Sequence, residues 1–343
     1  MADYELLLNK NEKIRDFYRY RLSAFYYLIV LLVTIFLITN FFSYSPDVSE
    51  ASSEEEAPAI QPLQNNLPVT TTPAPPSAPY NYSELPLCSQ PKSTASRIDP
   101  TELMTEFNRC ASMILMRFQR NAEGLLFNWP YTVYVCDEED ELMKIPLRSF
   151  ENGEKNYWAV LPNCQEESTF ITLGTGGNSK AQDDLKEMVG NLTTYGTDPF
   201  LSENESYDHF FPVALSNNEP NLEMRGTFGR MTKVPTAWQR QFFNETVAVK
   251  RIDMLWINPN AGNFEYWNYL NENGKFDEMG IVVCQLNIEI NKEDAAHWEQ
   301  LIMPLVKEKR YVFMRPMATE GGQVTRTFFL NAKDPECVRK YLL

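Results

Sequence analysis

Histidine is nearly absent from the sequence: only His209 and His297 occur among 343 residues. No cysteine–histidine cluster has the spacing of a zinc site, and no nucleophilic triad or D-x-D pair of the kind that holds a sugar nucleotide's metal is present. The sequence therefore predicts no metal site. Both histidines lie in segments that read as exposed helix or loop, so we expect surface roles for them.

Basic residues are also few, with 31 Lys and Arg against 46 Asp and Glu and a net charge of −15. A protein that neutralises nucleic-acid phosphates needs a basic face, so this balance argues against a nucleic-acid partner. Hydrophobic residues make up 43% of the chain and aromatic residues 13%. This content excludes disorder of the whole chain and allows a large buried core.

Charged residues are missing altogether from residues 22–42, a mostly apolar run. As a helix the run would span about 30 Å, the thickness of a bilayer core, so it predicts a transmembrane helix. A cleaved signal peptide fits less well, because the run is long and begins well inside the chain.

The flanks of this run predict an orientation. Basic residues precede it and acidic residues follow it. By the positive-inside rule, the tail 1–21 would be cytosolic and the chain would be a type II single-pass protein. The apolar run would then be a signal-anchor, and the membrane would be a binding partner of the protein. The rest would lie in the secretory-pathway lumen (Golgi or ER) or outside the cell.

Glycine, with 14 residues, is outnumbered by 22 prolines, many of which fall within residues 43–86. That segment is also rich in Ser, Thr and Glu, and it cannot bury enough apolar surface to fold. We therefore expect a disordered stem there. Residues 87–343 would then form one lumenal domain, a size that a single fold can fill.

All 6 cysteines lie beyond the apolar run, and an even count indicates disulfide bonds formed in an oxidising compartment. The N-x-S/T sequons lie beyond it too. They make the protein a predicted glycoprotein, with candidate sites at Asn81, Asn191, Asn204 and Asn244.

Hydrophobic periodicity divides the domain into strands and helices. Helices are predicted over residues 100–119 and 180–189. Strands are predicted at 131–136, 157–161, 170–173, 192–196, 211–215, 252–257, 281–290, 310–315 and 324–330. Strands that alternate with helices imply an α/β fold, with a mainly parallel sheet and helices on both faces.

The strand-to-helix turn that contains Gly174 and Gly176 has the pattern of a site for a nucleoside-type cofactor. Glycines let a ligand approach backbone N–H groups, and the following helix offers its positive end. Asp198 ends the next strand, where an acid commonly binds ribose hydroxyls. Because Ser179 replaces the third glycine of G-x-G-x-x-G, S-adenosylmethionine is favoured over NAD. The alternative is a tight turn beside a solvated aspartate.

Seven stretches share an order with a known family: FITLGTGGNSKAQDDLKE, TTYGTDP, FFPVALS, RIDMLWINPNAGNFE, GIVVCQLNIEI, KRYVFMRP and TRTFFLNAKDPECVRKYL. Over about 156–343 the chain thereby resembles the FkbM-type methyltransferase domain in its nematode version. The resemblance implies a Rossmann-like, S-adenosylmethionine-dependent methyltransferase fold with an antiparallel last strand. It also implies that Gly174 and Gly176 contact the cofactor and that Asp198 binds its ribose.

The chain departs from this family after the fourth strand, where the family carries an acidic I-D-x-E-G-x-E signature. Asparagine replaces all three acids, as Asn258, Asn260 and Asn263. Asn291 stands where the family's fifth strand usually ends in histidine. Asparagine keeps hydrogen-bonding capacity but cannot act as a base, so the catalytic residues stay unidentified.

The implied fold also predicts disulfide partners. Its antiparallel last strand lies beside the fifth, so Cys284 and Cys337 would come close enough to pair. Cys88–Cys110 and Cys136–Cys164 would then be local bridges, among the many pairings that six cysteines allow.

Two functions stay open. One is a membrane-anchored lumenal methyltransferase that transfers a methyl group from S-adenosylmethionine to an unknown acceptor. The expected acceptor atom is an oxygen, carried by a small molecule, glycan, lipid or protein. The other is a non-catalytic methyltransferase-fold protein, a binding or scaffold module, as the loss of the acidic signature suggests. A third, an ion-pump accessory subunit, is opposed by the Rossmann-like strand order.

Overall fold

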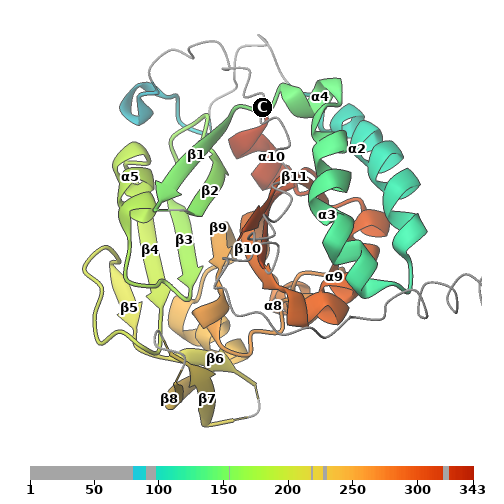
Figure 1. The fold of residues 1–343 in the computed structure, drawn as a ribbon. Coiled ribbons are helices and arrows are strands. Elements are labelled where there is room, and N and C mark those ends of the chain that lie inside the picture. Colours follow the sequence, from blue (N-terminus) through green and yellow to red (C-terminus); the bar gives the residue numbers. More distant parts are fainter. Residues whose placement is uncertain (1–79, 90–97, 154, 218, 227–229, 320–323) are drawn as a thin grey trace, which may run out of the picture. The chain divides into compact units, whose positions relative to one another are not determined.

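A seven-stranded sheet runs through the centre of the fold (Figure 1). From edge to edge its strands are β11 (Tyr311–Thr319), β12 (Val324–Asn331), β10 (Val282–Asn291), β9 (Arg251–Ile257), β3 (Ser168–Leu173), β4 (Leu192–Thr197) and β5 (His209–Phe211). Neighbours are parallel except at β12, which is antiparallel to both β10 and β11. The predicted α/β class with a mainly parallel sheet is confirmed.

The computed structural model describes residues 80–89, 98–153, 155–217, 219–226, 230–319 and 324–343. All of these belong to one unit, 74–343. The predicted cytosolic tail 1–21, the apolar run 22–42 and most of the predicted stem 43–86 lie outside the described residues.

The prediction of a single membrane span is contradicted, and with it the type II topology, the membrane as a partner and the anchored localisation. Within the part of the chain that the structure describes, no helix has both the length and the apolar character needed to cross a membrane. The run 22–42, on which the prediction rested, is not among the described residues.

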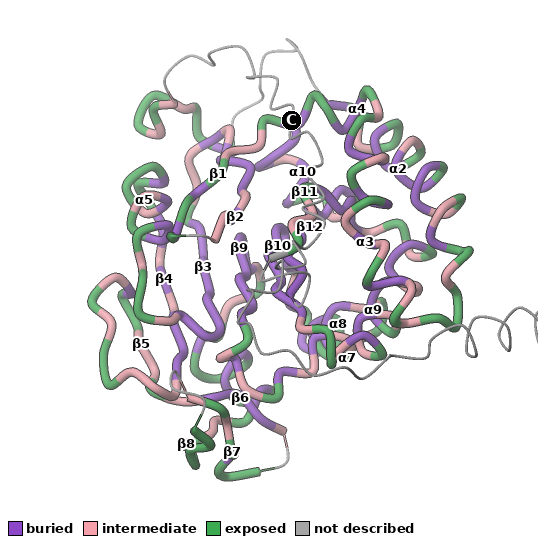
Figure 2. The backbone as a smooth tube through the Cα atoms, viewed as in Figure 1, coloured by how far each residue is buried: buried purple, intermediate pink, exposed green. Residues whose placement is uncertain are grey.

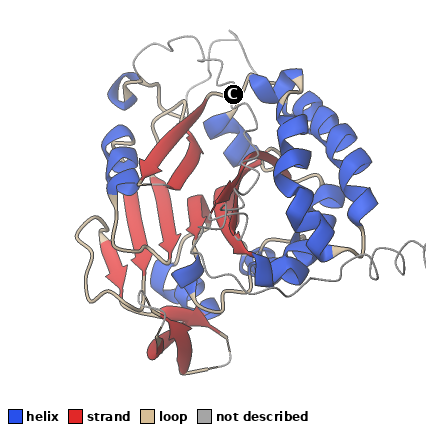
Figure 3. Ribbon diagram, in the orientation of Figure 1, coloured by secondary structure: helices blue, strands red, loops and turns tan. Residues whose placement is uncertain are grey.

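Helices and a hairpin cover the two faces of the sheet (Figure 3). One face packs against α2 (Pro100–Leu115), α3 (Ala122–Asp137) and α9 (Ala295–Glu308). The other packs against α5 (Lys180–Met188) and a hairpin of β1 (Leu147–Asn152) and β2 (Lys155–Val160). The other α-helices and strands of the described residues are α4 (Asp140–Met143), α6 (Gln239–Gln241), α7 (Tyr266–Tyr269), α8 (Lys275–Met279), α10 (Pro335–Tyr341), β6 (Ala214–Ser216), β7 (Asn221–Arg225) and β8 (Met231–Trp238).

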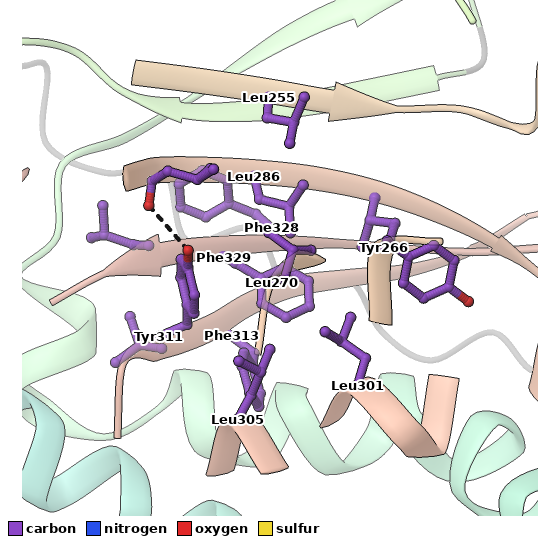
Figure 4. Close-up of a cluster of buried hydrophobic side chains, with 14 of the residues drawn as sticks. Leu255, Tyr266, Leu270, Leu286, Leu301, Leu305, Tyr311, Phe313, Phe328 and Phe329 are labelled. Atoms are coloured by element: carbon purple, nitrogen blue, oxygen red, sulfur yellow. Dashed lines mark hydrogen bonds between the residues drawn. The ribbon is translucent and has the colours of Figure 1, made fainter. Parts of the chain in front are cut away.

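The larger core lies between the sheet and α2, α3 and α9, and Figure 2 shows the buried central strands. Its aromatic side chains pack edge to face: the ring centroids of Trp129 and Trp298 are 5.0 Å apart, and those of Phe313 and Phe329 are 4.8 Å apart. Figure 4 shows Phe313 and Phe329 between the strands and α9. Burial of this apolar surface is the main driving force for folding here.

The predicted strand at 131–136 is wrong, because these residues belong to helix α3. β-branched and aromatic residues favour a strand locally, but tertiary packing overrides that preference. Asn121 caps the helix by accepting a hydrogen bond from Gly124 N at 3.0 Å. Trp129 is fully buried on the sheet side, and a disulfide to α2 fixes the other end of the helix.

The single strand predicted at 211–215 is instead two strands in different sheets. β5 ends at Phe211 and β6 begins at Ala214, and β6 pairs with β8 in a small three-stranded sheet. Pro212 lies at the break, and it has no N–H to continue a ladder.

Amide side chains of β10 hold the β1–β2 hairpin against the sheet. Asn287 accepts from Trp158 N at 2.9 Å and donates to Trp158 O at 2.8 Å. Gln285 does the same with Val160 N and O, at 2.7 and 2.9 Å. Each amide thereby satisfies both backbone groups of one residue, as a neighbouring strand would.

Three disulfides join the described cysteines: Cys88–Cys164, Cys110–Cys136 and Cys284–Cys337. The predicted Cys284–Cys337 bond is confirmed. The predicted Cys88–Cys110 and Cys136–Cys164 bonds are wrong. Helices α2 and α3 pack together and bring Cys110 to Cys136, while a bridge between Leu87 and Gln165 brings Cys88 to Cys164.

A buried ion pair fastens α10 to the amino ends of the central strands. The Lys340 ammonium is fully buried and donates to Glu167 O, Ser168 Oγ and Asp253 Oδ1 at 2.8, 2.9 and 2.8 Å. Asp253 also accepts from Thr169 N and from the Tyr341 hydroxyl, both at 2.9 Å. Burial lowers the pKa of Lys340, and the Asp253 charge opposes that shift.

Removing this ammonium tests its role. Lys340→Met is expected to lower the free energy of unfolding by about 3 kcal/mol, because Asp253 loses its buried cation and keeps only Arg251, whose Nε lies 3.1 Å from Oδ1. Urea denaturation measures the change. Lys333→Met is the control, since the Lys333 ammonium makes exposed contacts with Glu272 at 3.6 Å and with Glu308 O at 3.4 Å, and its expected effect is under about 1 kcal/mol. Equal effects of the two substitutions would contradict the assignment.

A buried carboxyl group at the end of α3 holds an irregularity of β11. The β11–β12 register shifts between Met314 and Met317, and Arg315 between them has a left-handed φ of 52°. Arg315 N donates to Asp137 Oδ2 at 2.8 Å. Burial raises the pKa of Asp137 to about 7, against the opposing effects of the Arg315 N–H and guanidinium.

This pKa makes stability pH-dependent. In the folded state the Asp137 carboxyl keeps its proton up to about pH 7, whereas in the unfolded chain it releases the proton near pH 4. The resulting stabilisation is therefore full below about pH 4 and is lost as the pH rises through about 7. The free energy of unfolding should fall by about 2–4 kcal/mol between pH 4 and 7 relative to Asp137→Asn. Urea denaturation across this range measures both proteins. Parallel pH curves would show that Asp137 is ionised when folded.

Candidate functional site

The glycine turn lies where the sequence predicts it, between the carboxyl end of β3 and the start of α5. Gly174 and Gly176 have φ values of 76° and 66°, which other residues rarely adopt. Gly174 N and Thr175 N both donate to Thr197 O, at 2.8 and 3.0 Å. A side chain at Gly176 would meet no neighbouring atom within 4 Å, so this part of the turn is open.

Asp198 follows β4 and faces this turn, but its carboxylate is engaged by the protein. Oδ2 accepts from Gly176 N at 2.9 Å, and Oδ1 accepts from Phe200 N at 2.9 Å. Asn260 Nδ2 lies 3.4 Å from Oδ2. The residue is 0% exposed. Asp198 therefore organises the turn, and none of its surface is open to a ligand.

Asn258, the first asparagine after β9, links three segments. Its backbone N donates to Leu173 O at 2.9 Å, and its side-chain Nδ2 donates to Gly174 O at 2.9 Å. Its Oδ1 accepts from the Tyr157 hydroxyl at 3.0 Å. An aspartate could accept from Tyr157 but could not donate to Gly174 O, so only the amide satisfies both partners.

The loop 258–262 fills the crevice between the ends of β9 and β3. A Cβ on Gly174 would lie 2.7 Å from Ala261 N and 2.8 Å from Asn260 C. On its other side the loop contacts β6: a Cβ on Gly262 would lie 2.8 Å from Ala214 Cβ. Two glycines thus allow a main-chain contact where open α/β sheets usually bind ligands.

The predicted site residues are brought together only in part. Gly174, Gly176, Asp198, Asn258 and Asn260 form one cluster at the carboxyl ends of β3, β4 and β9. Asn263 is exposed and Asn291 is half-buried at the end of β10. Within the described ranges, no hydrogen bond joins either of these two side chains to the cluster.

The Tyr157 side chain is a part of the site that sequence reasoning missed. Its ring stacks on Trp256 with centroids 4.0 Å apart and planes 9° apart. Burial, and secondarily the Glu289 charge, raises the pKa of Tyr157, so its hydroxyl stays protonated and donates to Asn258. The two residues are 101 positions apart, and no local pattern could have linked them.

A second missed feature is a charged group near Tyr157. The buried Arg326 guanidinium lies 2.5 Å from Glu289 Oε2, and Lys155 Nζ lies 3.4 Å from the same atom. The arrangement links β12, β10 and β2. The Glu289 carboxylate is thereby paired with two cations.

The remaining candidates lie elsewhere. His209 is exposed and stacks on Tyr195 with centroids 4.8 Å apart, and half-buried His297 stacks on Trp267 at 3.6 Å. Among the residues that the structure describes, no group of three or more His, Cys, Asp or Glu could hold a metal ion. The predicted glycosylation sites Asn81, Asn191 and Asn244 are exposed, whereas Asn204 is half-buried.

Comparison with known proteins identifies one distant relative. No family model matches the chain. The chain is similar to a protein of Caenorhabditis elegans described as "Uncharacterized protein C28H8.7", with 23% identity over 228 residues. The match covers 63% of this chain and 74% of that protein.

The Asn258 contacts can be tested by one isosteric change. Asn258→Asp is expected to lower the free energy of unfolding by about 1–3 kcal/mol, because a carboxylate cannot donate to Gly174 O. Asn263→Asp, directly after this loop, is the matched control, with an expected change within about 0.5 kcal/mol. Chemical denaturation measures both, and a neutral Asn258→Asp would contradict the role given to the amide.

Proposed function

We propose that the chain is a Rossmann-like methyltransferase-fold domain of FkbM type that serves as a non-catalytic binding or scaffold module. The strand order β5-β4-β3-β9-β10-β12-β11, with an antiparallel last strand between β10 and β11, supports the fold assignment. After β3 the chain adds β4 and β5 on one side of that strand and then returns to add β9 on its other side. The strand order therefore reverses between β3 and β9, which is the topological switch point of the sheet.

The observation that carries the proposal is the state of Asp198. S-adenosylmethionine, which the family resemblance implies, would need this carboxylate for its ribose hydroxyls. Both Asp198 oxygens instead accept backbone N–H groups of the protein, and the residue has no exposed surface. The loop 258–262 also packs onto Gly174. These residues do not fit the cofactor as they stand.

The lack of a base agrees with a non-catalytic role. Asn258 and Asn260, which stand where the resemblance puts acids, are tied to Gly174 and Asp198. Neither can accept a proton from an attacking oxygen, a step for which a base would contribute about 10²–10⁴-fold.

An active methyltransferase is the second candidate. It is favoured by the left-handed Gly174 and Gly176 and by the exposed residues Gly177 and Asn178 ahead of α5, which leave a backbone edge accessible. For this candidate, the loop 258–262 would have to move away to expose Asp198.

Titration with S-adenosylmethionine separates the two. At about 1 mM ligand we expect no calorimetric signal and no change in the melting temperature of the protein. A ligand with a Kd of about 10 μM would instead add roughly 2.7 kcal/mol of stability at that concentration, and melting would shift by several degrees. Such a shift, reproduced with S-adenosylhomocysteine, would favour the enzyme.

A further inference from the structure

An open pocket of ≈ 800 Å³ lies away from the glycine turn, beside the amino end of β4. Its walls come from the segment 80–83, from β1 and from the second half of α5. The volume is in the range of small-molecule sites, about 300–1,000 Å³. The residues that bear on its chemistry are Tyr80, Asn81, Tyr82, Arg148, Asp184 and Glu187.

Two tyrosine rings in the wall are held in place by their hydroxyl groups. Tyr80 Oη donates to Pro162 O at 3.0 Å, and Tyr82 Oη donates to Glu166 O at 2.9 Å. Both rings pack against the buried cluster around Phe150 and Leu185. Because their hydroxyls are engaged behind the wall, the rings offer the pocket half-exposed apolar surface rather than polar groups.

The charged groups of the pocket have both signs. Arg148 Cζ lies 5.6 Å from the centroid of the Tyr80 ring, and no carboxylate pairs with it among the described residues. Glu187 is exposed, and Asp184 is paired with Lys180. A strongly charged ligand would meet a like charge, whereas a neutral ligand with many hydroxyls would find both donors and acceptors.

We propose that this pocket binds carbohydrate. Aromatic rings suit the apolar faces of sugars, and the guanidinium and carboxylate groups suit their hydroxyls. Asn81 belongs to the wall and to the sequon Asn81-Tyr82-Ser83, and it is exposed. The sugar is therefore either the chain's own N-glycan on Asn81 or a free saccharide. This inference does not depend on the proposed function.

The first arm of the test examines the attached glycan. The full chain is produced in secreting cells, glycopeptides are mapped, and native protein is treated with a glycosidase. If the Asn81 glycan occupies the pocket, its removal is expected to be about tenfold slower than removal at exposed Asn244, a difference of about 1.4 kcal/mol. Arg148→Gln should abolish the protection, and Arg117→Gln, an exposed arginine outside the pocket, should not.

The second arm examines a free sugar. Ser83→Ala removes the sequon and leaves the Asn81 side chain able to accept from residue 83 N at 3.2 Å and to donate to Glu84 Oε1 at 2.7 Å. N,N′-Diacetylchitobiose is titrated into this variant and into the unaltered protein, with a Kd of about 1–10 mM expected. Arg148→Gln and Glu187→Gln should each weaken binding at least about fivefold.

The arms distinguish the two sources. Protection at Asn81, with free-sugar binding only after Ser83→Ala, assigns the pocket to the attached glycan. Binding by both proteins without protection assigns it to a free saccharide. Equal glycosidase rates at Asn81 and Asn244, or an unoccupied Asn81, together with no saturable binding up to about 50 mM, would overturn the proposal. Near-ultraviolet circular dichroism checks that each variant is folded.

Discussion

The buried Asp253 carboxylate is the contact on which the centre of this structure depends. It joins β9 to β3 through Thr169 N and to α10 through Lys340 and Tyr341. These bonds lie at the amino ends of the strands, where they agree with the parallel register that pairs Leu173 with Ile257 at the other end. Because that register is fixed, the turn after β3 and the loop after β9 emerge side by side.

Closure of the crevice at the carboxyl ends follows from that placement. Asn258 can bind Gly174 O and the Tyr157 hydroxyl at once because an amide both donates and accepts. Asp198 is turned inward and satisfies the N–H groups of Gly176 and Phe200. The Asn258 amide thus makes contacts that a carboxylate could not make, and they lie where open α/β sheets usually bind ligands.

The two ends of the sheet consequently differ in accessibility. At the carboxyl ends, backbone and amide groups satisfy one another, whereas the pocket beside the amino end of β4 keeps charged and aromatic groups facing solvent. Its walls come from residues near 80, 148 and 187, which are distant in sequence. No sequence motif predicts such a pocket. Of its residues, Asn81 was a candidate site from the sequence, and only because it belongs to a glycosylation sequon.

Local patterns in the sequence were enough to determine the α/β class, the strands on either side of Gly174, the position of Asp198 and the asparagine-rich loop after β9. Those features depend on hydrophobic periodicity and residue type, which can be recognised within a short stretch of sequence. Only the tertiary structure decided that 131–136 is helical, that Cys110 pairs with Cys136, and that Asp198 is buried. Each of these depends on contacts between segments far apart in the chain, and burial, not local preference, sets their free energy.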